Sequence, residues 1–298
     1  MNLLSFIDNS PTAFHAVKNI CDTLKSHGFT QLYEGDSWDI NEGDRCFVTR
    51  NGSSVIAFEI PQCSYTGITV CASHTDSPCF AVKSSPEMSA VNSLIRLNVE
   101  GYGGMLRESW FDRPLSVAGR IAVSADGGIE ERLVNIDRDL MIIPSLAVHM
   151  GKAHCEDKIN IQNEMLPILK SDSEQTCFLE LVAENAGVKA SDIKGCDLYL
   201  YNRQKCTVFG ASKEFIGGGR LDNLENVYLS LNAFLNSEKS TAMKIHAAFD
   251  SEETGSLTRR GADSTFFTDV LERINDCLGV SEGEYKRRLA NRVINLMQ

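Results

Sequence analysis

The stretch from Leu224 to Phe249 determines the fold class that the sequence predicts. Its first part, Leu224-Glu-Asn-Val-Tyr-Leu-Ser-Leu-Asn-Ala-Phe-Leu235, repeats large apolar residues at intervals of four, three and four, which predicts an amphipathic helix. Its second part, Met243-Lys-Ile-His-Ala-Ala-Phe249, predicts a strand, and residues 262–277 and 283–296 predict two further helices. Strands and helices that alternate with short links favour parallel pairing. We therefore expect an α/β fold, a three-layer sandwich with a mostly parallel sheet.

Toward the N-terminus the same pattern continues. A helix is predicted from Ser10 and Pro11, the first as N-cap, to Gly28, and apolar strands are predicted at 46–49, 55–60 and 68–71. From about residue 90 to 205, strand signals alternate with glycine-rich turns, and helical periodicity is found only at 179–186. We expect residues 1–89 and 206–298 to form one discontinuous α/β domain, interrupted by a mostly β domain at 90–205.

Composition excludes several classes of protein. The chain has 298 residues and a formal net charge of −11, which argues against binding to nucleic acid or to an anionic membrane surface. No apolar run is long enough to span a bilayer, and the N-terminus lacks the basic residues of a signal peptide. The ten cysteines are scattered without a Cys-x-x-Cys pair, as expected of reduced thiols in a cytoplasmic protein.

Polar residues that packing alone does not explain follow the predicted strand at 68–71. In Cys71-Ala-Ser-His-Thr-Asp-Ser-Pro78, the side chains of His74 and Asp76 lie two residues apart, on one face of an extended segment. A histidine oriented by a neighbouring carboxylate is a common metal-ligand arrangement. The alternative is a turn at the end of the strand, in which Asp76 only caps the backbone.

Two further polar segments flank the stretch that determines the fold. Asp222 precedes the predicted helix, where it is either a helix N-cap or a ligand. Glu252 and Glu253 follow the strand that ends at Phe249, and two adjacent carboxylates there would repel each other unless a cation relieved them. One could then bind metal while the other acts as general base on a water; the alternative is a solvated acidic turn. Nitrogen and oxygen donors of this kind suit zinc, manganese or cobalt.

In this order, these segments resemble the aspartyl aminopeptidase family of co-catalytic zinc metallopeptidases. The resemblance extends over nearly the whole chain. It is carried by Ser10-Pro-Thr-Ala-Phe-His-Ala-Val17, Ala72-Ser-His-Thr-Asp-Ser-Pro78, Ser109-Trp-Phe-Asp-Arg-Pro-Leu-Ser-Val-Ala-Gly-Arg120, Arg220-Leu-Asp-Asn223 and Phe249-Asp-Ser-Glu-Glu-Thr-Gly-Ser256. It implies removal of N-terminal Asp or Glu residues from peptides, two zinc ions, and a homo-oligomer, a dodecamer in the family.

The resemblance also assigns roles to individual residues. It implies that His74 and Glu253 are terminal ligands of the two zinc ions and that Asp222 bridges them. Glu252 would be the base that activates the bridging water, and Asp76 would orient His74.

Outside these segments, the resemblance implies that His149 reaches a neighbouring subunit's active site, although its place after an apolar run is more typical of a structural histidine. The inserted domain would provide dimer contacts and narrow the entrance. The remaining histidines are interpreted as structural: His15, His27, His154 and His246.

The sequence departs from the family after Asn291. Two of the family's five metal ligands lie beyond the segment that matches residues 288–291, and the only candidates here are His74, Asp222 and Glu253. We therefore expect a chain truncated at the C-terminus and impaired in catalysis. Two other interpretations stay open: a catalytically inactive assembly member of the fold, and a different co-catalytic zinc hydrolase such as a deacylase.

Overall fold

The computed structural model describes residues 1–147, 149 and 159–296. The chain divides into two compact units, one formed by Met1–Ser77 with Arg220–Gln298 and the other by Pro78–Gly219. The boundaries differ from the changes of pattern near residues 89 and 205. Strand β5 (Cys79–Ala90) and the hairpin of β11 (Thr207–Phe209) and β12 (Phe215–Gly217) belong to the second unit.

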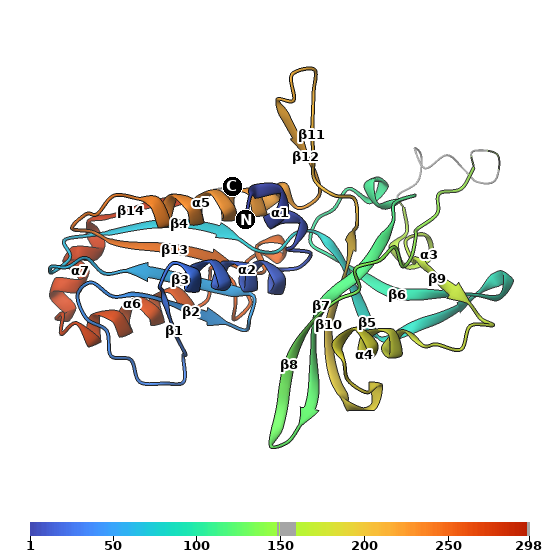
Figure 1. Ribbon diagram of the computed structural model, residues 1–298, viewed down its shortest axis with the longest axis horizontal. Helices are drawn as coiled ribbons and strands as arrows, with labels where there is room; N and C mark the ends of the chain where they lie inside the picture. Colours follow the sequence, from blue (N-terminus) through green and yellow to red (C-terminus); the bar gives the residue numbers. More distant parts are fainter. Residues whose placement is uncertain (148, 150–158, 297–298) are drawn as a thin grey trace. The chain divides into compact units, whose positions relative to one another are not determined.

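The first unit contains a six-stranded sheet in the order β1-β2-β3-β13-β4-β14 (Figure 1). Three of its five pairings are parallel, those of β1 with β2, β13 with β4, and β14 with β4. The predicted mostly parallel sheet is thus confirmed. Its strands are β1 (Thr30–Leu32), β2 (Arg45–Arg50), β3 (Ser54–Glu59), β4 (Ile68–His74), β13 (Met243–Phe249) and β14 (Arg292–Leu296).

Helices cover both faces of this sheet, which confirms the three-layer sandwich. Along β13, Ile245 packs with the apolar face of α6, whereas the ring of His246 lies 6.1 Å from Phe234 of α5. This alternation of side chains is what a strand buried between two helical layers requires. The helices are α1 (Leu3–Asp8), α2 (Ala13–Ser26), α5 (Leu221–Asn236), α6 (Phe266–Cys277) and α7 (Glu282–Ala290), with a short 3₁₀ turn at Glu252–Thr254. Within the described residues, no helix is both long and apolar enough to cross a membrane.

The structure corrects the helix predicted at 283–296. Helix α7 ends at Ala290, and residues 292–296 form β14, which pairs in parallel with β4. Pairing with a buried neighbour outweighs helical propensity in a segment this short. Helix α2 begins at Ala13 with Thr12 as N-cap, not at Pro11, and helix α1, capped by Asn2, was not predicted.

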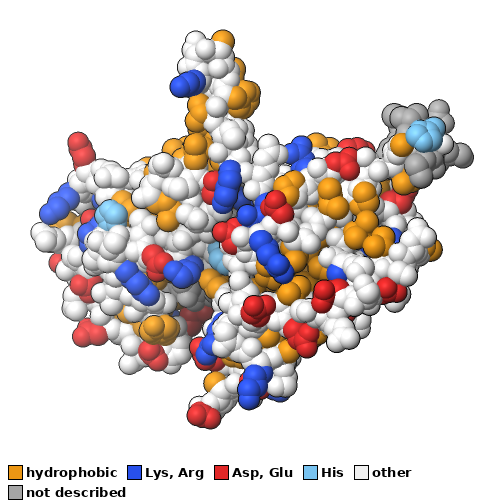
Figure 2. Space-filling model, turned by 45° about the vertical axis from the view of Figure 1, so that its right-hand side comes forward, with side chains coloured by type: hydrophobic (Ala, Val, Ile, Leu, Met, Phe, Trp, Pro, Cys, Tyr) orange, Lys and Arg blue, Asp and Glu red, His pale blue; other side chains and the backbone are white. Residues whose placement is uncertain are grey.

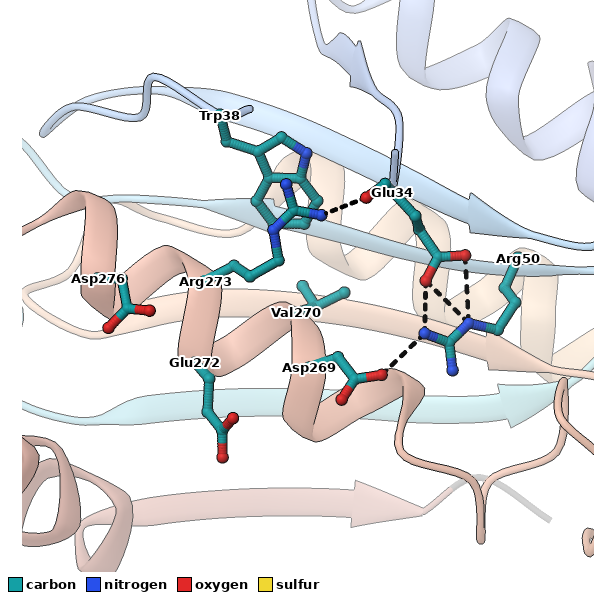
Figure 3. Close-up of a pocket in the computed structure, with 8 residues that line it drawn as sticks. All are labelled: Glu34, Trp38, Arg50, Asp269, Val270, Glu272, Arg273 and Asp276. Atoms are coloured by element: carbon teal, nitrogen blue, oxygen red, sulfur yellow. Dashed lines mark hydrogen bonds and ion pairs between the residues drawn. The ribbon is translucent and has the colours of Figure 1, made fainter. Parts of the chain in front are cut away.

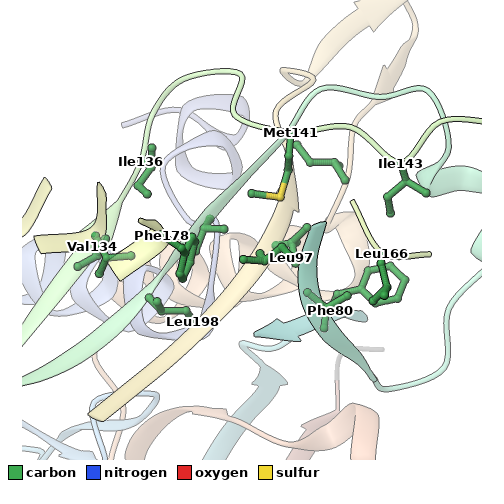
Figure 4. Packing of buried hydrophobic residues seen from close by; sticks show 14 of the residues in the cluster. Phe80, Leu97, Val134, Ile136, Met141, Ile143, Leu166, Phe178 and Leu198 are labelled. Atoms are coloured by element: carbon green, nitrogen blue, oxygen red, sulfur yellow. The ribbon is translucent and has the colours of Figure 1, made fainter. Parts of the chain in front are cut away.

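The second unit is built on an antiparallel six-stranded sheet in the order β8-β7-β10-β5-β6-β9. Its core includes Phe80, Leu97, Phe178 and Leu198, each 2% exposed or less (Figure 4). The further strands are β6 (Leu94–Tyr102), β7 (Leu115–Ala125), β8 (Gly128–Asn135), β9 (Ile168–Ser171) and β10 (Ile193–Asn202). The helices are α3 (Ile161–Glu164) and α4 (Phe178–Ala186), with 3₁₀ turns at Val91–Ser93, Arg107–Trp110 and Ala190–Asp192.

His246 in the centre of β13 makes the stability of the first unit sensitive to pH. The residue has no exposed surface, and neither ring nitrogen has a hydrogen-bond partner among the described residues. Burial lowers the pKa of His246 to about 4, because a charged ring would lose its hydration. In the unfolded chain the ring takes up a proton near its ordinary pKa of about 6.5. Between these two values the unfolded state binds more protons, so the free energy of unfolding falls as the pH is lowered.

We expect the His246→Leu variant to lose less stability than the wild type when the pH is lowered from 7 to 5. The difference should be about 2 kcal/mol, and urea unfolding at each pH measures it. His27→Leu, a change at an exposed histidine at the end of α2, is the control and should follow the wild type. Equal pH slopes for His246→Leu and the wild type would contradict this assignment.

Candidate metal centre

The carboxyl ends of β4 and β13 meet at one edge of the first unit's sheet. The two strands pair in parallel, and their register places Phe249, the last residue of β13, opposite His74, the last residue of β4. The residues that follow each strand therefore emerge side by side. Open α/β sheets gather their ligands at this edge.

Four of the predicted site residues converge at this edge. The Nε2 atom of His74 lies 3.3 Å from Oδ1 of Asp222 and 3.8 Å from Oε2 of Glu252. Glu253 joins them, because ligand atoms of His74, Glu252 and Glu253 all lie within 4.8 Å of one another. The side chain of His74 is only 10% exposed, whereas those of Asp222 and Glu252 are 79% and 52% exposed. The cluster thus has a buried imidazole at its base and carboxylates open to solvent.

Asp76 connects the ends of the two strands. Its buried carboxylate accepts hydrogen bonds from the backbone amides of Glu252 and Glu253, each at 3.2 Å. The Nδ1 atom of His74 lies 3.1 Å from the carbonyl oxygen of Asp76 and 3.4 Å from its Oδ1. One carboxylate therefore holds both the turn that carries the two glutamates and the far side of the imidazole ring. Asp76 does not merely cap its own turn.

The cluster contains four carboxyl groups around one imidazole, so negative charge is in excess. Burial favours the neutral ring of His74, but the hydrogen bond with Asp76 and the charges of Asp76, Glu252 and Asp222 outweigh it and raise the pKa of His74. Burial, and then the charges of Asp76, Glu252 and Asp222, raise the pKa of Glu253 to about 7, against the opposing effect of His74. A bound cation would relieve this repulsion.

The donor set fits zinc. One imidazole nitrogen and several carboxylate oxygens that converge within 4.8 Å match the ligand types of catalytic zinc sites. Manganese and cobalt would suit the same donors. His74, Asp222 and Glu253 would hold the metal, and the distribution of roles among the carboxylates stays a prediction.

Asp222 faces His74 instead of capping a helix. Helix α5 has Arg220 as its N-cap, and the backbone of Asp222 is extended, with φ −79° and ψ 108°. The carboxylate of Asp222 lies beside the ring of His74. The backbone carbonyl oxygen of Asp222 accepts a hydrogen bond from Oγ of Ser77 at 2.9 Å. This bond ties the segment after β4 to the start of α5. No sequence motif indicated this role of Ser77.

The predicted histidine His149 lies in the second unit and is exposed. The residues on either side of it, and His154, lie outside the described residues. The role predicted for His149 in a neighbouring subunit stays a prediction.

A buried ion pair that no sequence motif indicated supports the turn with the two glutamates. Asp250, which directly follows β13, is 3% exposed, and its Oδ2 lies 2.9 Å from Nε of Arg260. The backbone amide of Asp250 also donates to the carbonyl oxygen of Arg260 and to Oγ of Ser54. The segment 250–261 is therefore closed at its base. Ten residues of continuous helix would separate Asp250 from Arg260 by about 15 Å, and ten residues of strand by about 33 Å, so no periodic pattern in the sequence pointed to the pair.

A pocket of about 360 Å³ lies elsewhere in the first unit, between α6 and the segments around Glu34 and Trp38 (Figure 3). Arg50 in its lining forms ion pairs with Glu34 and Asp269, and Cζ of Arg273 lies 3.6 Å from the centroid of the Trp38 ring. Its lining contains none of the residues of the metal centre. These contacts join α6 to the β1–β2 connection. We therefore interpret the pocket as a gap between packed segments, without a role in catalysis.

A three-layer α/β sandwich with an imidazole and carboxylates at the carboxyl edge of its sheet defines a metal-dependent hydrolase. The family described as "Aminopeptidase I zinc metalloprotease (M18)" matches residues 6–296. The chain belongs to this family of zinc metalloexopeptidases.

Curated relatives carry the same family name. "Probable M18 family aminopeptidase 2" of Clostridium acetobutylicum is 40% identical over 298 residues, covering 97% of this chain and 69% of the relative. The protein of that name from Pseudomonas paraeruginosa is 40% identical over 281 residues, covering 91% and 65%. The chain thus spans about two thirds of the length of these relatives.

Solved structures agree with the fold. Chaetomium thermophilum mApe1 has a TM-score of 0.91 and 30% identity, with 98% of this chain and 72% of that chain covered. The Ape4 and Nbr1 complex gives a TM-score of 0.91 and 32% identity, and the chain spans 61% of the matched chain. A dodecamer of S. cerevisiae mApe1 gives a TM-score of 0.85 and 27% identity, with 98% and 69% covered.

We expect Arg260→Leu to weaken zinc binding by 10- to 100-fold, roughly the cost of losing a residue that supports metal ligands. The change leaves the carboxylate of Asp250 buried without its cation, so the free energy of unfolding should also fall by about 3 kcal/mol. Competition with a chromophoric chelator measures the affinity, and urea unfolding measures the stability. The neighbouring exposed Arg259 provides the control, Arg259→Leu, which should change neither. Unchanged zinc affinity in Arg260→Leu would show that the pair does not position the turn.

Proposed function

We propose that this chain is an aminopeptidase that removes N-terminal aspartate or glutamate from peptides, with two zinc ions held by His74, Asp222 and Glu253. The observation that carries the proposal is the convergence of these residues with Glu252 at one edge of the sheet. The match of five sequence segments to aspartyl aminopeptidases supports the acidic substrate. When bound, the metal supplies a Lewis acid that polarises the peptide carbonyl and lowers the pKa of water.

The chain's own residues then have distinct tasks. Glu252, whose carboxylate is half exposed beside His74, accepts a proton from the attacking water and passes it to the leaving amine. Asp76 keeps the ring of His74 in place and holds the backbone of Glu252 and Glu253 through their amides. His149 of a neighbouring copy stabilises the developing negative charge.

The proposal extends to the assembly and location of the protein. A homo-oligomer is supported by the dodecamer of the yeast relative, and the unit Pro78–Gly219 is proposed as a surface for assembly and for narrowing the entrance. The nine cysteines among the described residues are reduced, which supports a cytoplasmic location.

A second candidate function follows from the ligand count. If Glu252 is the base, three of the converging donors remain for two ions among the described residues, whereas one catalytic zinc normally has three protein ligands. The small number of ligands favours a chain with impaired catalysis. If catalysis is lost entirely, the chain would be an inactive assembly member of the fold.

The purified full chain tests both candidates through its zinc content per chain and its release of aspartate from an Asp-x peptide. We expect bound zinc, zinc-dependent release, and faster cleavage of Asp-x and Glu-x than of Leu-x. Glu252→Gln should keep its zinc and lose about 100-fold or more in kcat, because a general base contributes roughly that much.

The control is Glu225→Gln, a change on helix α5 outside the cluster, which should behave as the wild type. Full turnover by Glu252→Gln would contradict the role of Glu252 as base. A folded protein with neither zinc nor peptide cleavage would identify the inactive assembly member.

A further inference from the structure

The hairpin of β11 (Thr207–Phe209) and β12 (Phe215–Gly217) is an unusual element of the second unit. Its two strands have three residues each and form a sheet of their own. Figure 1 shows the hairpin extending away from the six-stranded sheet of that unit. An isolated two-stranded hairpin is at best marginally stable in water, so a hairpin this short needs something to pack against.

Both faces of the hairpin are apolar. The register pairs Val208 with Ile216 and Phe209 with Phe215, and because successive residues alternate, the two pairs lie on opposite faces. The phenyl rings are 5.5 Å apart, and they are 53% and 54% exposed. Val208 and Ile216 are 48% and 40% exposed. In an antiparallel sheet, the face exposed to water normally carries polar side chains. In this hairpin both of these pairs are apolar, one on each face.

The charge of the hairpin indicates what kind of surface it meets. The chain carries a net charge of −11, but residues 206–219 contain one lysine, Lys213, and one glutamate, Glu214, and so have no net charge. Glu214 folds back to accept the amide of Ser212 at 2.8 Å. Two copies of an acidic chain repel each other, and they approach at the lowest electrostatic cost through neutral apolar projections. A strongly basic partner would gain nothing from such a surface.

We propose that the β11–β12 hairpin is a self-association element, in which Phe209 and Phe215 pack against a second copy of this chain. The inference rests on the homo-oligomer of the proposed function and names its contact surface. Figure 2 shows the hairpin as a projection that carries apolar side chains. Two half-exposed rings offer about 200 Å² per copy. A stable interface needs about 800 Å² per partner, so the hairpin forms the apolar centre of a larger contact.

The experiment compares the masses of full-length variants by sedimentation velocity and light scattering between about 1 and 50 μM. The wild type should form an oligomer, and Phe209→Ser combined with Phe215→Ser should dissociate to a smaller species, with association at least 10-fold weaker. Ile129→Ser is the matched control, because Ile129 is an apolar residue of strand β8 in the same unit that is 61% exposed. It should keep the wild-type mass.

A folded double variant with the wild-type mass would overturn the proposal, and so would a wild type that stays monomeric over the whole range. The Phe209→Trp variant provides a second test that preserves the apolar surface. Its added indole emission should shift to the blue as the oligomer forms and back to the red on dilution. If the protein associates but the emission wavelength of this variant does not change with concentration, the contact lies elsewhere and the proposal is overturned.

Zinc content and aspartate release, measured on the same samples, separate this inference from the catalytic proposal. Loss of the oligomer with zinc retained supports the hairpin contact. Loss of zinc binding with the oligomer intact counts against the proposed metal centre alone and leaves the hairpin assignment supported.

Discussion

The parallel pairing of β4 with β13 is the constraint on which the rest of the candidate site depends. The two strands are separated by more than 160 residues of chain, and most of the intervening chain forms the second unit. Their register sets His74 beside Phe249, so the residues after each strand emerge at the same edge. A shift of one residue would turn every side chain of β13 to the opposite face and bury His246 against the other helical layer.

Once the strand ends meet, Asp76 determines the local arrangement. Its carboxylate receives two backbone amides from the turn after β13 and lies beside the imidazole of His74. The pair of Asp250 and Arg260 closes the same turn at its base. These contacts hold Glu252 and Glu253 near Asp76, and burial together with the neighbouring negative charges raises the pKa of Glu253. The chain belongs to a family of zinc metallopeptidases, and a bound zinc ion would offset the repulsion between these carboxylates.

Much of the fold followed from local patterns. The amphipathic spacing around Leu224 and Leu235 predicted α5, and the apolar run from Met243 to Phe249 predicted the strand at the centre of the sheet. The patterns failed where long-range pairing decided the outcome. Residues 292–296 continue a helical segment in sequence, yet they form a strand because β4 offers a free edge beside them. The short helix α1, six residues with a capping box, lies below the length at which apolar periodicity is informative.

By itself, the sequence determined the chemistry that the site has at its disposal: an imidazole and carboxylates placed just after strands or just before a helix. It also determined the class of fold, because periodicity and strand length are properties of neighbouring residues. Only the tertiary structure decided that His74, Asp222, Glu252 and Glu253 meet, that Asp222 faces His74 instead of capping α5, and that Arg260 neutralises Asp250. Those outcomes depend on register and packing between segments far apart in the chain, and no local pattern encodes them.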